Sequence, residues 1–325
     1  DVIGVLGAQR LLLPLSRGEQ PVLASLLDPP VFVPETLSGM ELLEHFRSAH
    51  AELVFVVDEY GAVQGVISER DVLEAITAEA HHLNIDVDGH VTHGVPVPDL
   101  IEAGQRGFAH LDEVTRAMNA DNGRRRTEIV QLLKSHDGYV STTMTVLKNA
   151  ADQIADYDRM AARPEMRFVF PMAKATFWSR AQNPYLKPGT NAAFFLSLLS
   201  ETKVALKQLN EAGVRLLAGT DALNPMIIPG ESIHDELALM VEAGLTPYQA
   251  LKTATANPSQ VLRRLRLTGI IAANREADLV LLESNPLFDV AAVRHPAGVA
   301  LRGHWYDRAA LDRRLDEVAK VAGAQ

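Results

Sequence analysis

The 325-residue chain contains no cysteine. It therefore cannot form a disulfide, use a thiolate as a nucleophile or hold zinc on thiolates, and a protein-bound metal must sit on His, Asp or Glu. No apolar run approaches the roughly 18 residues that span a bilayer, and the first ten residues lack the pattern of a signal peptide. The net charge of −10 argues against nucleic-acid binding, which requires Lys and Arg to neutralise phosphates. We expect a soluble, cytoplasmic protein with neither a membrane nor a nucleic-acid partner.

Positive charge is scarce in the first quarter of the chain. Residues 1–79 contain 4 Arg, no Lys and 13 acidic residues, a net of −9, whereas the remainder carries 27 basic and 28 acidic residues, a net of −1. Such a shift indicates two segments of different origin. We place the domain boundary there, with one domain over residues 1–79 and a second over residues 80–325.

The first segment has the order helix, strand, strand, helix. "MELLEHFRSA" has apolar residues at helical spacing, and "LVFVVDEYGAVQGVIS" reads as two strands joined by a turn in which Gly61 takes a positive φ. "SERDVLEAI" then begins a helix, with Ser68 as N-cap and Asp71 in the first turn.

This segment resembles part of the CBS-domain pair of the hemolysin C/CorC group of proteins. The stretches that carry the resemblance are "DVIGVL", "LLDPPVFVPETLSGMELLEHFR" and "LVFVVDEYGAVQGVISERDVLEAI". In CBS modules, a Ser/Thr-x-x-Asp pattern at the final helix often holds the ribose of an adenine nucleotide. The resemblance therefore implies a nucleotide site at Ser68 and Asp71, and helix capping is the alternative role for the same two residues.

Beyond residue 80, short strands alternate with longer helical stretches, as in βα units. "LNIDVDGHV" predicts a strand that ends at His90, and "GFAHLDEV" predicts one that ends at His110. A third strand is predicted over residues 139–146, and "VRLLAGTDA" predicts a fourth with Asp221 at its carboxyl end. Active-site groups of α/β barrels collect at such strand ends, and two imidazoles with one carboxylate can hold a divalent metal. His93 would point away from His90, which makes it a candidate for substrate contact or for a hydrogen bond to a metal ligand, and simple exposure in a loop is the alternative.

The second segment resembles the C-terminal portion of the amidohydrolase superfamily, with the imidazolonepropionase- and prolidase-like members as the most similar group. The motifs are "GHVTHGV", "AGQRGFAHLDE", "LLAGTDA", "SIHDELALMVEAGLTPYQALKTATANP" and "GIIAANREADLVLLESNPLFDV". The resemblance implies that His90, His110 and Asp221 are metal ligands, that Asp221 also moves a proton, and that His234 lies near the substrate. It also implies a divalent cofactor, with zinc as the expected ion.

Two family elements have no counterpart here: the chain contains no His-x-His, and CBS-like sequence stands where four preceding βα units belong. We therefore expect an α/β protein: a partial CBS module, then the C-terminal half of a TIM-type (β/α) barrel with remnants of a small β-domain. A half barrel would expose sheet edges. Pairing as a homo-oligomer, covering of the edge by CBS-like strands and a poorly folding fusion are the three alternatives.

Three functional hypotheses follow. The first is a metal-dependent hydrolase that cleaves an amide, ester or related C–N or C–O bond of a small-molecule substrate, with Asp221 as the base. The second is a non-catalytic regulatory protein in which the CBS-like module senses an adenine nucleotide. The third is a truncated fusion that retains no activity.

Overall fold

The computed structural model describes residues 2–49, 51, 53–92, 95–264 and 266–323. The chain divides into two compact units, one made of residues 1–87 and 92–104 and the other of residues 88–91 and 105–325. The boundary predicted after residue 79 rests on the difference in charge between the two segments of the sequence. It stays a prediction. None of the helices in the described ranges combines the length and apolar character that a bilayer crossing requires.

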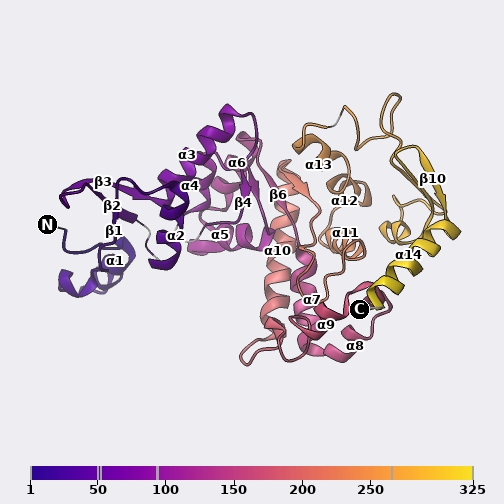
Figure 1. Ribbon diagram of the computed structural model, residues 1–325, viewed down its shortest axis with the longest axis horizontal. Helices are drawn as coiled ribbons and strands as arrows, with labels where there is room; N and C mark the ends of the chain where they lie inside the picture. The colour runs from indigo at the N-terminus through magenta and orange to yellow at the C-terminus, as the bar shows by residue number, and fades with distance from the viewer. Residues whose placement is uncertain (1, 50, 52, 93–94, 265, 324–325) are drawn as a thin grey trace. The chain divides into compact units, whose positions relative to one another are not determined.

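The first unit contains a three-stranded sheet with helices before and after its last two strands (Figure 1). Its elements are α1 (Ala8–Ser16), a 3₁₀ turn η1 (Leu23–Leu26), β1 (Phe32–Pro34), α2 (Gly39–Ala49), β2 (Leu53–Val57), β3 (Val63–Ser68), α3 (Glu69–His82) and α4 (Val97–Glu102). β1 pairs with β2 in parallel and β2 with β3 antiparallel. Gly61 in the turn between them has a φ of 79°, as predicted. Val33, Phe46 and Val54 form a buried cluster in this unit.

The second unit is built on a parallel sheet of four short strands in the order β4-β5-β6-β7. The strands are β4 (Asp88–Gly89), β5 (Gly107–Phe108), β6 (Tyr139–Ser141) and β7 (Arg215–Leu217). The predicted order of strands is therefore correct, but each strand is shorter than its motif suggested. The third was expected to run to Val146; it ends at Ser141 because the chain turns at Thr143, whose φ is 49°.

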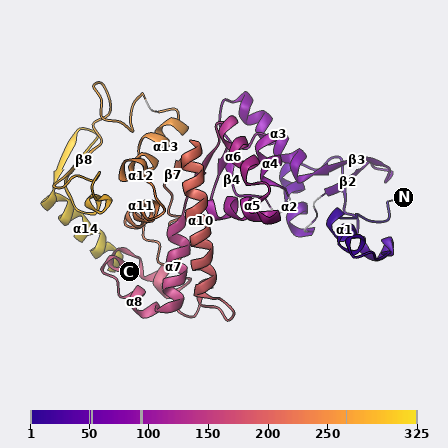
Figure 2. The same ribbon diagram turned by 180° about the vertical axis from the view of Figure 1, so that it is seen from behind.

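Helices connect these strands. They are α5 (Leu111–Gly123), α6 (Arg126–Ser135), α7 (Met144–Ala155), α8 (Tyr157–Ala161), η2 (Pro164–Phe168), α9 (Pro171–Ala175), η3 (Pro184–Leu186), α10 (Ala192–Ala212), α11 (Ser232–Glu242), α12 (Pro247–Thr253) and α13 (Ala256–Val261). α7 and α10 lie side by side, as Figures 1 and 2 both show. A Thr–Pro pair in the sequence favours the start of a helix, and α12 begins at Pro247 with a capping box between Thr246 and Gln249.

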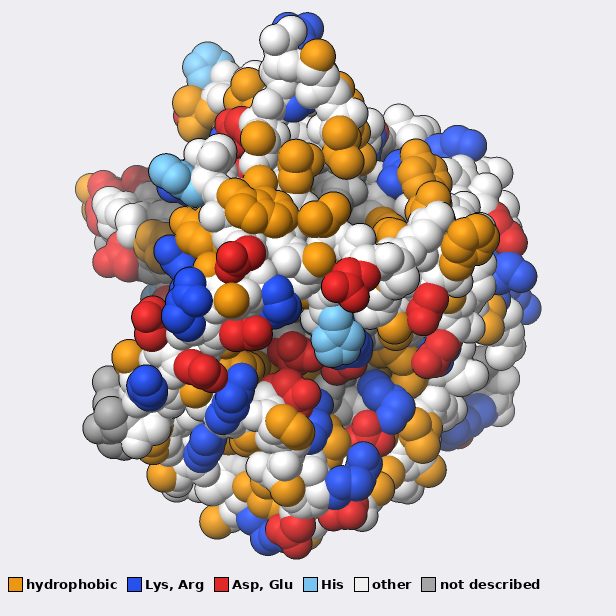
Figure 3. All heavy atoms as spheres, turned by 90° about the vertical axis from the view of Figure 1, so that its right-hand side faces the viewer, with side chains coloured by type: hydrophobic (Ala, Val, Ile, Leu, Met, Phe, Trp, Pro, Cys, Tyr) orange, Lys and Arg blue, Asp and Glu red, His pale blue; other side chains and the backbone are white. Residues whose placement is uncertain are grey.

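The C-terminal part is a small antiparallel sheet followed by a helix. Its elements are β8 (Leu279–Leu282), η4 (Val290–Arg294), β9 (Pro296–Leu301), β10 (His304–Asp307) and α14 (Arg308–Gly323), with the strands in the order β10-β9-β8. On the face drawn in Figure 3, hydrophobic side chains gather in the upper part, and charged side chains are numerous in the lower half. Exposed apolar residues of these strands include Val280, Leu281 and Trp305.

Candidate functional site

His90 and His110 lie next to each other at the carboxyl ends of neighbouring strands. His90 directly follows β4, and His110 comes two residues after β5. Because β4 and β5 are parallel partners, both residues leave the sheet at the same edge. The centroids of their imidazole rings are 4.7 Å apart, with a tilt of 40° between the ring planes.

Each imidazole is oriented through its Nδ1 atom. Nδ1 of His90 lies 3.0 Å from Oε1 of Glu113, and the backbone N–H of Val91 donates to the second carboxylate oxygen of Glu113 at 2.8 Å. Nδ1 of His110 is hydrogen-bonded to Oγ1 of Thr143 at 3.0 Å. A neutral His whose Nδ1–H donates to a carboxylate has an unprotonated Nε2, which is the arrangement common for metal-binding imidazoles.

The residues on either side of Thr143 are held by the buried carboxylate of Glu236, which comes from α11. This carboxylate is fully buried and accepts hydrogen bonds from the hydroxyl of Thr142 and from the backbone N–H groups of Met144 and Thr145, the last two at 3.0 and 2.7 Å. Burial raises the pKa of Glu236, although these hydrogen bonds oppose that shift. Glu236 thus fixes the turn that carries the partner of His110.

Asp221 lies four residues after β7 and takes a φ of 52°. The side-chain amide of Asn224 donates to its carboxylate, and the phenol of Tyr185 donates to Oδ1 of Asn224 at 2.9 Å. Burial and then the negative charges of Asp221 and Asp112 raise the pKa of Tyr185 to about 12. Asp112 stands in the first turn of α5, two residues after His110. Tyr185 therefore lies within electrostatic range of both ends of the predicted site.

The structure brings together two of the three predicted metal ligands. His90 and His110 are brought together, but no group of three His, Cys, Asp or Glu side chains in the described part of the chain is arranged to hold a metal. The donor chemistry of the imidazole pair fits a divalent cation, whereas the carboxylate of Asp221 is engaged by Asn224.

Two further carboxylates lie near the histidine pair. Burial raises the pKa of Asp88, while a hydrogen bond from Tyr139 and the charges of His110 and His90 lower it. Burial likewise raises the pKa of Asp112, with Arg116 acting in the opposite direction. Carboxyl groups with a raised pKa beside imidazoles are candidates for proton transfer.

Of the two predicted substrate contacts, His93 lies outside the described residues. His234 stands in the first turn of α11, where Glu231 and Asp235 both form ion pairs with Arg294. Its Nδ1 atom is buried without a hydrogen-bond partner among the described residues. Burial lowers the pKa of His234, so the neutral imidazole is favoured.

Ser68 and Asp71, the predicted nucleotide contacts, form a reciprocal capping box at the start of α3. The backbone N–H and the hydroxyl of Ser68 both donate to Oδ2 of Asp71, at 2.7 and 2.6 Å. These hydrogen bonds lower the pKa of Asp71. The capping role predicted for the pair is therefore present, and nucleotide binding stays a prediction.

Four residues of this region were not predicted from the sequence: Glu113, Thr143, Tyr185 and Glu236. Only Glu113 carried a usable signal, since it stands three residues after His110 in the first turn of the following helix. The others come from distant segments, and only the folded chain brings them to the site.

Comparison with known proteins identifies the family of the chain. The model of the amidohydrolase family matches residues 36–305. The chain belongs to the amidohydrolase family. The structure of a bottromycin amidohydrolase aligns with a TM-score of 0.58 and 22% identity, over 97% of this chain and 72% of that one. This likeness supports the α/β fold that the sequence predicts.

The chain is also similar to proteins of the hemolysin C group. It is 34% identical to the UPF0053 protein YegH of Escherichia coli (strain K12) over 114 residues, which are 31% of this chain and 22% of YegH. It is 39% identical to hemolysin C of Brachyspira hyodysenteriae over 79 residues, 24% of this chain and 29% of that protein. The chain thus spans about a fifth of the length of YegH. Both family resemblances predicted from the sequence are confirmed.

Proposed function

We propose that this chain is a hydrolase of the amidohydrolase type, acting on an amide, ester or related C–N or C–O bond of a small molecule. The observation that carries the proposal is the pair of imidazoles of His90 and His110, 4.7 Å apart at the ends of adjacent parallel strands. Membership of the family over residues 36–305 supports it.

In this proposal the two imidazoles hold a divalent cation, with zinc as the proposed ion. Such an ion would supply Lewis-acid activation of water and of the scissile carbonyl. Glu113 orients the ring of His90 and Thr143 orients the ring of His110, each through the Nδ1 atom of the ring. Both Nε2 atoms are then left to bind the cation. Asp221 serves as the proton acceptor, and Asn224 and Tyr185 orient its carboxylate.

The metal content of the purified chain tests this proposal. Elemental mass spectrometry after dialysis against zinc should find near-stoichiometric zinc in the native chain and little in His110→Gln. His136→Gln is the matched control, because His136 is exposed and Nδ1 of its ring contacts only the neighbouring Ser135 and the backbone oxygen of Leu132. Equal zinc in all three proteins, or none in a folded native chain, would contradict the proposal. A screen of amide and ester substrates follows on the zinc-loaded chain.

A further inference from the structure

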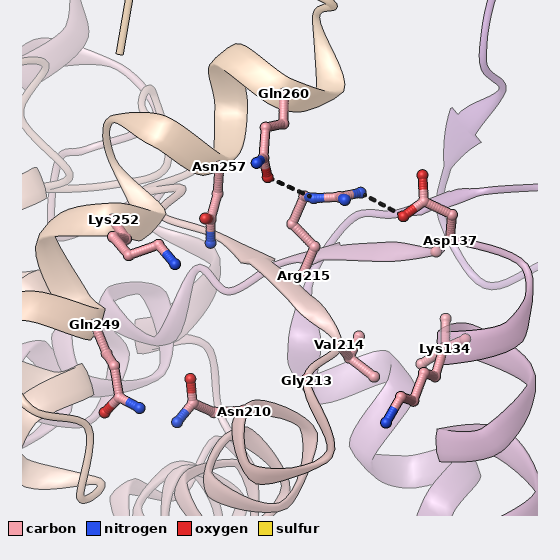
Figure 4. Close-up of a pocket in the computed structure, with 12 residues that line it drawn as sticks. Lys134, Asp137, Asn210, Gly213, Val214, Arg215, Gln249, Lys252, Asn257 and Gln260 are labelled. Carbon is pink, nitrogen blue, oxygen red and sulfur yellow. Dashed lines mark hydrogen bonds and ion pairs between the residues drawn. The ribbon is translucent and has the colours of Figure 1, made fainter. Parts of the chain in front are cut away.

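A polar pocket lies at the end of the sheet opposite to His110 and Asp221. Its lining includes Gly138, just before β6, and Val214, just before β7, so it opens at the amino-terminal ends of these strands. The C-terminal parts of α6 and α10 and the helices α12 and α13 supply the remaining walls (Figure 4). The cavity measures about 320 Å³, which is at the lower end of the range for small-molecule sites.

The pocket carries an excess of positive charge in an acidic protein. The ammonium groups of Lys134 and Lys252 reach toward it from opposite sides (Figure 4). In the described part of the chain, neither lysine forms an ion pair with a carboxylate. The one acidic residue of the lining, Asp137, is already paired with the guanidinium groups of Arg215, at 2.9 Å, and Arg106. Both ammonium groups therefore lack a carboxylate partner among the described residues, although Nζ of Lys252 also lies 5.9 Å from the ring centroid of Tyr248.

Neutral hydrogen-bonding groups surround these charges. The carboxamides of Asn210 and Gln249 lie close to each other on the wall formed by α10 and α12, on the same side of the pocket as Lys252 (Figure 4). The last turns of α6 and α12, where Lys134 and Lys252 stand, favour cations through the helix dipole. The helix dipole explains why a lysine stands at the end of each helix. It does not supply a negatively charged partner between the two lysines.

We propose that this pocket binds the phosphate group of a phosphorylated small molecule. Two ammonium groups and two amide N–H₂ groups are donors that a compact oxyanion can accept from all sides. The cavity also leaves room for an organic portion beside the phosphate. The site is separate from the histidine pair and involves none of its residues.

Isothermal titration calorimetry at fixed ionic strength tests the proposal, with ribose 5-phosphate, inorganic phosphate and ribose as probes. We expect saturable binding of ribose 5-phosphate to the native chain and none of ribose. Lys134→Met and Lys252→Met should each weaken binding by about tenfold or more, since a hydrogen bond to a charged group is lost. Lys174→Met removes an equally exposed ammonium group from α9, away from the pocket, and should leave binding unchanged.

Two controls separate the alternatives. His110→Gln should bind ribose 5-phosphate like the native chain, because a loss there would place the phosphate at the histidine pair and overturn the proposal. Equal affinities for inorganic phosphate and ribose 5-phosphate would assign the pocket to the phosphate group alone and would support the proposal in that form. Failure of both probes to bind saturably, or equal weakening by Lys174→Met, would overturn it.

Discussion

Glu113 contacts His90 from the first turn of the helix that His110 begins. Its carboxylate lies 3.0 Å from Nδ1 of His90, and His110 stands at the N-cap of the same helix, α5. One short segment therefore supplies one imidazole of the pair and the carboxylate that orients the other. This coupling makes Glu113 the first residue to test.

Glu113→Gln should weaken zinc binding about 10- to 100-fold, because partners that orient a metal-binding His contribute this much to affinity. Competition with a zinc chelator measures the change. The control is Glu283→Gln, an exposed carboxylate of the same unit, which should retain native affinity. An unaltered zinc affinity in Glu113→Gln would separate Glu113 from the metal site.

Glu236 gives the chain a pH-dependent stability. Its pKa is raised in the folded state, so the folded chain binds more protons than the unfolded chain once the pH exceeds about 4.5, the ordinary pKa of Glu. The free energy of unfolding should therefore fall as the pH rises from there toward the raised pKa, by at most about 1.4 kcal/mol per pH unit.

Glu236→Gln removes this titration. Denaturant unfolding between pH 4 and 7 should show the variant gaining stability relative to the native chain as the pH rises. A difference in unfolding free energy that stays constant across this range would show that Glu236 does not titrate there. The variant should also lower zinc affinity, because the turn that holds Thr143 against His110 loses an acceptor for its N–H groups.

Gly107→Ala tests how closely the strands of the parallel sheet approach. A Cβ at Gly107 would lie 2.4 Å from Cγ of Asp88 and 2.6 Å from Cε2 of Tyr139, which no packed structure accepts. We expect a loss of about 1–3 kcal/mol in unfolding free energy, measured by urea denaturation. Gly89→Ala is the control on the adjacent strand, because its nearest neighbour would be 3.8 Å away. Equal stability of the two variants would contradict this packing.

The CBS-like unit offers a matched pair of caps. Ser38 and Glu41 form the same reciprocal hydrogen bonds at the start of α2 that Ser68 and Asp71 form at α3. Ser38→Ala and Ser68→Ala should each cost about 0.5–2 kcal/mol of stability. Only Ser68→Ala should also lose binding of adenosine monophosphate, measured by calorimetry. A native chain that does not bind this nucleotide would leave Ser68 with the capping role alone.

Much of the fold could be predicted from the periodicity of apolar residues and from the residues that begin helices or form turns. The capping residues Ser68 and Thr246 and the turn at Gly61 are local signals, and the structure reproduces them. The third strand was overextended because the run of Thr and Val after Ser141 favours a strand, whereas the tertiary structure places Met144 at the start of α7. The strand propensity of these residues does not reveal that the tertiary structure starts a helix within the run.

The site was predictable only in its outline. Strand ends placed His90 and His110 at one edge, but the 4.7 Å between their rings depends on the register of β4 against β5. Glu236 was missed because a glutamate within an amphipathic helix ordinarily faces solvent, and nothing near it in sequence shows that it is buried. Long-range contacts of this kind are properties of the fold.

The division of the chain into units has a practical consequence for dissecting it. The backbone passes from one unit to the other three times: before Asp88, after Val91 and after Gly104. A cut after residue 79 would divide α3 and break the hydrogen bond that the hydroxyl of Thr77 donates to the carbonyl of Ala103 beside α4. A cut after residue 104 would remove β4 and His90 from the second unit. The two units alternate along the chain between residues 87 and 105. Neither unit can therefore be expressed alone by a single truncation, because residues 88–104 are shared between them.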